Sequence, residues 1–264
     1  MTPDRYLDVL TTDGARLAQV ARATELDDPI PSCPGWTVAD CVLHTGAVFF
    51  NKAGWLDIGR RPQAGEYESE PIPGEALVDY YERALAAIVG ALESRDPTAP
   101  ADSWWPRDQT VGFWYRRMAQ EVAVHRVDVE DAQGAPGPVP DDVAVDGIDE
   151  VLHVFLEEDW PSFTPDDWGG VDPEAGAGAT VLVRAGDRAW ATTLGPDAMP
   201  TTDVDPDAPE AEAEGGAAAD ATVTGDPENV LLWLWGRRPD AAVHLEGDRD
   251  VLAAFRARLV LATQ

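Results

Sequence analysis

Glu121 and His125, four positions apart, are the strongest candidates for chemistry in this sequence. They lie in "EVAVHRVDVEDAQG" (121–134), a stretch that otherwise favours a helix, where four residues make just over one turn and place both side chains on one face. That face is mainly apolar, with Met118 and Trp114 one and two turns back. If the face is buried, Glu121 needs a partner, because an unpaired buried carboxylate is costly. The pair is therefore compatible with a surface or structural ion pair, or with part of a metal site.

His44 is a third candidate ligand, and it lies in a second apolar segment, "ADCVLHTGAVFF" (39–50). A lone buried histidine is more often a hydrogen-bonded core residue than a ligand. Two helices of one bundle, however, would combine His44 with Glu121 and His125 into a set that suits a catalytic divalent metal with an open fourth position. Such a set accepts zinc, nickel, iron or manganese. Asp128, one turn after His125, is a fourth ligand, an acceptor that orients a ring N–H, or a solvated acid.

Other residue types indicate no second chemistry. His153 has acidic residues around it at helical spacing and is expected on a solvated face, and we expect no role for His244. The two cysteines, Cys33 and Cys41, are too few for a zinc knuckle and are expected to be reduced thiols. The sequence contains no P-loop, no dinucleotide-binding glycine motif after a strand and no Gly-x-Ser-x-Gly motif.

Helices are predicted to position the candidate ligands. Apolar residues recur at helical spacing in five segments, at about 3–23, 37–58, 75–95, 110–133 and 140–159. The second of these begins with a capping-box pattern formed by Thr37 and Asp40. The loop before the fourth contains Trp104 and Trp105, which could form a wall of a substrate site. We therefore predict a helical bundle with an extra helix over residues 1–162.

The remaining part of the chain is predicted to form a small α+β domain. A linker rich in Pro, Gly and Asp is expected at 163–178, and the spacing of apolar residues then changes from helical to alternating, which predicts the order β-β-β-α-β-α over 179–264. An acidic segment at about 196–219 lacks Lys and Arg, and we predict that this insertion is at least partly disordered. Arg237 and Arg238 follow a short apolar helix, where they could bind a carboxylate or complement the helix C-terminus.

Composition excludes several partners. The 264 residues carry a net charge of −30, which argues against nucleic acid or an anionic membrane as a partner. No apolar run of about 18 residues predicts a membrane span, and the N-terminus lacks the apolar core of a signal peptide. We therefore expect a cytoplasmic protein. Lys52 is the only lysine, and this bias toward arginine fits a GC-rich genome.

Two blocks together resemble the mycothiol-dependent maleylpyruvate isomerase family. They are "SCPGWTVADCVLHTGAV" (32–48) and "EVAVHRVDVEDA" (121–132). Two later blocks, "DDVAVDGIDEVLHVFL" (141–156) and "LLWLWGRRP" (231–239), are also similar to that family, so the resemblance covers nearly the whole chain. It implies an N-terminal four-helix bundle of the DinB-like type and a small C-terminal domain similar to sterol carrier proteins.

The resemblance also implies a site and an activity. It implies one divalent metal, usually zinc, held by His44, Glu121 and His125, and mycothiol as a thiol cosubstrate. A metal-bound thiolate would then attack a small-molecule electrophile, either as an isomerase acting on maleylpyruvate or as an S-transferase. Arg237 is expected to bind the substrate carboxylate, with Arg238 as a close alternative. A hydrolase that uses metal-bound water, and a non-catalytic metal- or ligand-binding module, remain as alternatives.

Overall fold

The computed structural model describes residues 1–67, 70–158, 160–162, 164, 166, 168–206 and 219–263. Its contacts divide the chain into two compact units, Met1–Pro138 and Val139–Gln264. The first unit is helical and the second contains a sheet, so the α+β prediction is confirmed. Among the described residues, no helix is both long enough and apolar enough to cross a membrane.

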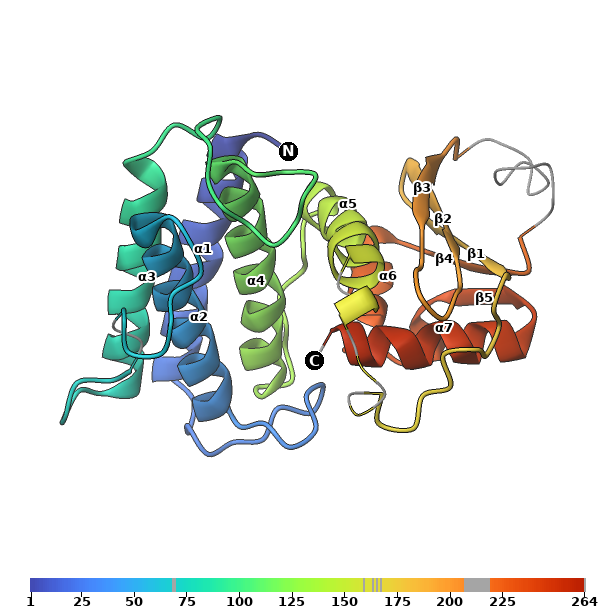
Figure 1. Ribbon diagram of the computed structural model, residues 1–264. Coiled ribbons are helices and arrows are strands. Elements are labelled where there is room, and N and C mark those ends of the chain that lie inside the picture. The colour runs from blue at the N-terminus through green and yellow to red at the C-terminus, as the bar shows by residue number, and fades with distance from the viewer. Residues whose placement is uncertain are drawn as a thin grey trace. The chain divides into compact units, whose positions relative to one another are not determined.

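Four helices form the first unit. They are α1 (Pro3–Arg22), α2 (Val38–Ile58), α3 (Leu77–Glu93) and α4 (Val111–Asp131). Figure 1 shows these helices side by side, with α1 packed mainly on α4 and α2 packed mainly on α3. The predicted ranges agree with the observed ones to within a few residues, because each helix buries the apolar stripe from which it was predicted.

The start of α2 is fixed by side-chain caps, as predicted. The Thr37 hydroxyl accepts a hydrogen bond from the Asp40 backbone N–H (3.3 Å), and the Asp40 carboxylate accepts one from the Thr37 backbone N–H (2.9 Å). This reciprocal capping box satisfies two N–H groups that have no partner within the helix. Gly59, with a φ of 80°, ends the helix in the left-handed conformation.

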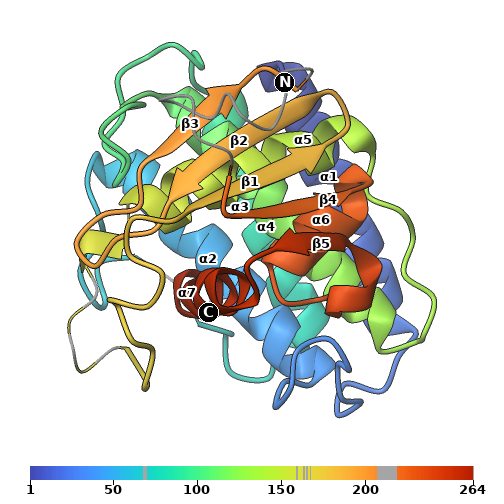
Figure 2. The ribbon, with the colours of Figure 1, turned by 90° about the vertical axis from the view of Figure 1, so that its right-hand side faces the viewer.

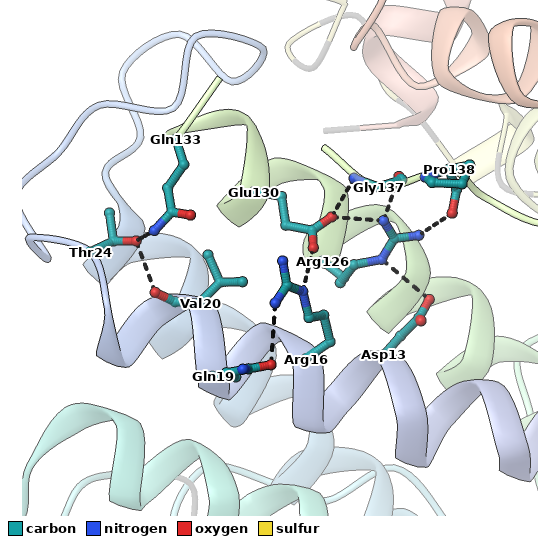
Figure 3. A network of polar contacts seen from close by, with 10 residues as sticks. All are labelled: Asp13, Arg16, Gln19, Val20, Thr24, Arg126, Glu130, Gln133, Gly137 and Pro138. Atoms are coloured by element: carbon teal, nitrogen blue, oxygen red, sulfur yellow. Dashed lines mark hydrogen bonds and ion pairs between the residues drawn. The ribbon is translucent and has the colours of Figure 1, made fainter. Parts of the chain in front are cut away.

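A buried polar network fixes α4 against α1 (Figure 3). Glu130 accepts hydrogen bonds from Arg126 (2.8 Å) and, across the bundle, from Arg16 (2.7 Å). Arg126 also donates to the carbonyl oxygens of Gly137 (2.6 Å) and Pro138 (3.1 Å), and the Gly137 N–H donates back to Glu130 (2.8 Å). The network holds α4 in one rotation about its axis and ties down the chain that follows it.

The second unit combines helices with a five-stranded sheet. Its elements are α5 (Asp141–Glu150), a π-helix (Val151–Glu158), β1 (Thr180–Ala185), β2 (Arg188–Thr193), β3 (Thr201–Val204), β4 (Ala221–Gly225), α6 (Pro227–Leu234), β5 (His244–Gly247) and α7 (Arg249–Ala262), with short 3₁₀ turns at Trp160–Ser162 and Asp240–Ala242. The strand order is β3-β2-β1-β4-β5, and only the pair β1–β4 is parallel. Figure 2 shows the strands side by side. Helix α7 packs on β1, β4 and β5, and α6 packs on β4 and α5.

Three features differ from the expectations. The division at Pro138 falls before the predicted linker at 163–178, because α5 packs against α6 in the second unit. The predicted fifth helix changes from α to π geometry at Val151. Strand β3 lies inside the segment at 196–219 that was predicted to be at least partly disordered, where it pairs with β2. Residues 207–218 of that acidic insertion lie outside the described residues.

Candidate metal centre

Helices α2 and α4 face each other in an antiparallel arrangement. The His44 and His125 rings lie 5.1 Å apart, centroid to centroid, and the Trp55 and Trp114 rings lie 5.0 Å apart. The second pair is eleven residues further along α2 and eleven residues further back along α4, so the two helices run in opposite directions. The facing sides of α2 and α4 therefore carry imidazoles at one end, His44 and His125, and indoles at the other, Trp55 and Trp114. We call this row of facing side chains the strip.

His44, Glu121 and His125 come together at the imidazole end. The Nε2 atoms of His44 and His125 each lie 3.4 Å from Glu121 Oε1, and all three ligand atoms lie within 4.8 Å of one another. Bonds of the length usual for zinc, arranged tetrahedrally, separate neighbouring ligand atoms by about 3.3–3.4 Å. The spacing and the donor types therefore fit one divalent ion. The structure brings the three predicted ligands together, and their role as ligands stays a prediction.

The candidate site is exposed at His44. The His44 side chain is 43% exposed, whereas those of Glu121 and His125 are 8% and 9% exposed. Both residues of α4 thus lie in a buried wall, and His44 lies at the solvent-facing edge. A small molecule can approach this set of ligand atoms from the side of His44.

Arg117 is the partner that the buried carboxylate needs. It lies one turn before Glu121 on α4, is equally buried, and donates a hydrogen bond to Glu121 Oε2. Burial alone would raise the pKa of Glu121, but Arg117, His125 and His44 hold it well below its usual range. Glu121 is therefore a carboxylate at neutral pH, with Oε1 turned to the histidines. The sequence analysis missed Arg117, although its spacing from Glu121 was the available signal.

Asp128 orients the ring of His125. Its Oδ2 lies 3.0 Å from Nδ1, so Nδ1–H donates to Asp128 and Nε2 is the ring nitrogen directed at Glu121 and His44. Of the three roles considered for Asp128, this geometry favours the orienting acceptor. Burial works against a charged ring, yet Cys41, Glu121 and Asp128 together raise the pKa of His125 well above its usual range. A metal ion would therefore displace a proton from this ring.

Trp36 covers the two histidines. Its ring is stacked on His125 at 6.1 Å and meets His44 edge-on at 5.1 Å. The turn before α2 holds this tryptophan in place, because the Ile30 N–H donates to the Trp36 carbonyl (2.9 Å) and Gly35 takes a φ of 91° that favours glycine. The sequence block "CPGW" thus supplies a hydrophobic cover for the ligand set.

Lys52 lies at the indole end of the strip. Its Nζ is 5.1 Å from the ring centroid of Trp55, 5.4 Å from that of Trp104 and 5.8 Å from that of Trp114. Burial lowers the pKa of Lys52 to about 8, an effect that the nearby charge of Glu121 partly offsets. The sequence singled out Lys52 only as the sole lysine, and nothing in its spacing predicted this environment.

A second group of metal-ligating types shares His125. Cys41, His125 and Asp128 are all buried and have ligand atoms within 4.8 Å of one another. The Cys41 thiol, however, lies 3.8 Å from the His125 carbonyl oxygen as a hydrogen-bond donor, and burial raises its pKa. A thiol that keeps its proton is a poor metal ligand. This group is better suited to support the first one than to bind an ion itself.

A third group lies in the second unit and is held by an arginine. Asp149 and Asp203 both pair with Arg188, and Asp149 also accepts from the Trp190 indole at 3.1 Å. His153, which belongs to the same group, is buried rather than solvated as predicted, and its Nδ1 lies 3.0 Å from a Glu157 carboxylate oxygen. These contacts already neutralise the two aspartates, and through Arg188 the group joins the end of α5 to β2 and β3.

Arg237 lies just after α6 in the second unit. Its guanidinium donates to the Trp235 carbonyl (2.6 Å), and the backbone N–H groups of Arg237 and Arg238 both donate to the Leu232 carbonyl (2.7 and 3.2 Å). These contacts cap the C-terminus of α6, where positive charge is favourable. The expected role of Arg237 toward a substrate carboxylate stays a prediction.

Comparisons with known proteins agree with the architecture. Residues 7–130 match the family described as "Mycothiol maleylpyruvate isomerase N-terminal domain", and residues 142–254 match "MDMPI C-terminal domain". A crystal structure of the mycothiol-dependent maleylpyruvate isomerase is 15% identical, with a TM-score of 0.56 and 93% of each chain covered. A histidine-to-alanine mutant of such an isomerase is 13% identical, with a TM-score of 0.60 and the same coverage. No curated protein matches the sequence. Because the two family matches together span most of the chain, it belongs to the mycothiol maleylpyruvate isomerase family, which is a family of enzymes.

Proposed function

We propose that this enzyme is a metal- and mycothiol-dependent isomerase or S-transferase whose metal is held by His44, Glu121 and His125. One observation carries the proposal: two imidazole nitrogens each lie 3.4 Å from the same carboxylate oxygen, which is the spacing of ligands around one small divalent ion. Family membership supplies the thiol and the isomerase-type activity. The donor set suits zinc, and an ion there would lower the pKa of a bound thiol so that the thiolate forms at neutral pH.

Residues around the ligand set prepare it for an ion. Arg117 keeps Glu121 ionised despite its burial, so the carboxylate needs no proton removed before it can bind a cation. Asp128 holds a proton on Nδ1 of His125, so Nε2 is the nitrogen from which an ion would displace a proton. Trp36 excludes water from one side of both rings. His44 lies at the exposed edge, where a thiol of low molecular weight can enter.

Arg237 is proposed to bind the substrate carboxylate. The support is the family resemblance of the "LLWLWGRRP" block and the chemistry of a guanidinium, which forms charge-assisted hydrogen bonds with carboxylates. Its position after α6 is defined by the cap to Leu232. Replacement by lysine would keep the charge but remove the planar arrangement of donors, which separates the two contributions.

Metal content and thiol binding test the proposal. The purified protein should contain about one equivalent of a divalent metal, and calorimetric titration should detect mycothiol binding. His44→Ala should lose both, whereas the control His244→Ala should lose neither, because that histidine is exposed in the second unit and its ion pair among the described residues is with Glu246. Wild-type protein without metal, or His44→Ala with undiminished metal content, would refute the metal site.

The alternatives give different results in the same assay. Bound metal without mycothiol affinity, together with turnover in the absence of any thiol, would indicate a hydrolase that uses metal-bound water. Bound metal without either property would indicate a non-catalytic metal-binding module. The exposed edge at His44 favours a catalytic site, because structural zinc sites are usually closed.

A further inference from the structure

Lys52 occupies a pocket made by three tryptophans from separate parts of the first unit. Trp55 belongs to α2, Trp114 to α4 and Trp104 to the loop between α3 and α4. The first two are fixed by one residue: Asp102 accepts a hydrogen bond from the Trp55 indole through its carboxylate (2.8 Å) and one from the Trp114 indole through its backbone carbonyl (3.0 Å). The pocket is therefore built by specific contacts.

The ammonium of Lys52 lacks a counterion. Within the ranges that the structure describes, no carboxylate lies within ion-pair distance of its Nζ, although the chain contains 49 acidic residues. The two nearby carboxylates are committed elsewhere, that of Asp102 to Trp55 and that of Glu121 to Arg117 and the histidines. The faces of the indoles stabilise the cation but leave its hydrogen-bonding capacity available.

A second donor at this pocket also lacks a partner. The indole N–H of Trp104 is buried, and no acceptor for it is found in the described part of the chain. Buried donors without acceptors are rare in folded proteins because each one costs free energy. Trp104 thus has a donor without an acceptor, and the cation over its ring has no carboxylate partner.

Charges of both signs act on Lys52. Glu121 attracts its ammonium most strongly, and Arg117 and Arg61 repel it. A divalent ion on the neighbouring ligand set would add further positive charge. Because the surrounding indoles keep the local dielectric low, attraction for an anion is stronger here than at the protein surface.

The pocket is at a suitable distance from the proposed metal ligands. Lys52 follows His44 by eight residues on α2, which is just over two turns and about 12 Å along the axis. Helical side chains lean toward the N-terminus, so the lysine stem points back toward the His44 end. A ligand of several carbon atoms could reach from one end of the strip to the other.

We propose that Lys52 binds a carboxylate of the substrate at the indole end of this strip, so that the enzyme selects anionic electrophiles. The proposal rests on the function proposed above, because it places the reacting part of the same molecule at His44, Glu121 and His125. Lys52 would act as a specificity-determining residue.

Binding of an inert dicarboxylate tests this assignment. Glutarate and its monomethyl ester, which has one negative charge fewer, should be titrated into metal-loaded protein by calorimetry. Wild-type protein should bind glutarate about tenfold more tightly than the ester, since a hydrogen bond to a charged group is worth that much or more. Lys52→Met should lose the preference, and Lys52→Arg should retain most of it.

Arg83→Met is the matched control. Arg83 is also a cation over aromatic rings, 4.7 Å from the Phe50 centroid, but a Glu75 carboxylate already binds it through two hydrogen bonds of 2.9 Å. Its removal should leave the preference for glutarate unchanged.

Two results would overturn the anion site: no preference for glutarate in wild-type protein, or an undiminished preference in a folded Lys52→Met variant. Circular dichroism establishes that each variant is folded. Metal content, measured on the same samples, reports separately on the proposed function. Absence of metal would refute that function, whereas normal metal with an unchanged glutarate preference would refute the role of Lys52 alone.

Discussion

Substituting methionine for Lys52 should remove a pH dependence of stability at alkaline pH. An ordinary lysine has a pKa of 10.5, and burial among the three indoles lowers that of Lys52 to about 8. Between these two values the unfolded chain holds a proton that the folded chain has released. The free energy of unfolding of the wild-type protein therefore rises with pH across this window.

The size of the effect follows from the two pKa values. A tenfold change in the proton equilibrium corresponds to about 1.4 kcal/mol, so moving from 10.5 to about 8 corresponds to roughly 3 kcal/mol. This contribution is fully present above the unfolded pKa of 10.5 and is lost as the pH falls through the folded value near 8. Methionine keeps a flexible apolar stem and has no proton to lose, so the variant should lack this term.

Urea unfolding of metal-free protein measures the term. The difference in unfolding free energy between wild type and Lys52→Met should shift by about 3 kcal/mol in favour of wild type between a pH below 8 and a pH near 10.5. Titrations of other groups occur in both proteins and cancel in the difference. A constant difference across the window would show that the ammonium is not desolvated, and would remove the electrostatic support for an anion site.

A direct titration of Lys52 is also possible, because the chain contains a single lysine. Reductive methylation with carbon-13 formaldehyde would give one ε-amine signal, which must be missing from Lys52→Met. In folded protein it should titrate near pH 8, and in urea near 10.5. The same value in both states would contradict the buried position of the side chain.

Two further substitutions test the packing that holds the site. Glu130→Ala should lower the free energy of unfolding in urea by about 3 kcal/mol, because Arg126 would lose its buried carboxylate. The control Glu82→Ala removes an exposed pair and should change this free energy little. An equal effect of both substitutions would contradict the importance of burial. Gly46→Ala should lower the free energy of unfolding by about 1–3 kcal/mol, because a Cβ there would lie 2.5 Å from Cε1 of the buried Tyr80 ring. Differential scanning calorimetry measures the effect, and an unchanged thermal transition would show that the ring can move aside.

The spacing of residues within single helices was enough to predict the proposed metal ligands. The four-residue interval between Glu121 and His125 places both on one helix face, and the capping box fixes where the helix that carries His44 begins. These are properties of one element and its own sequence. Arg117 belongs to the same stripe, and the reasoning that a buried carboxylate needs a partner could have found it one turn away.

Tertiary contacts made the rest unpredictable. The pocket of Lys52 depends on Trp104, which a loop brings between two helices, and no periodicity in the sequence places a loop residue there. Strand β3 was missed for a similar reason: its neighbours are acidic, and its stability comes from pairing with β2, where the Thr192 and Thr201 hydroxyls meet at 2.9 Å. In both cases the deciding partner is distant in the sequence.

The net charge of the chain and the cations of its candidate site act over different distances. The total of −30 is the reason why polyanionic partners are not expected. Surface charges are screened within about 10 Å at moderate salt, whereas Arg117 and Glu121 are buried and the ammonium of Lys52 lies over indole rings, so these charges are screened less. An anionic substrate that has entered therefore responds mainly to the buried cations. The acidity of the surface should reduce the rate at which such a substrate arrives, and added salt should increase that rate without weakening the buried contact to the same extent.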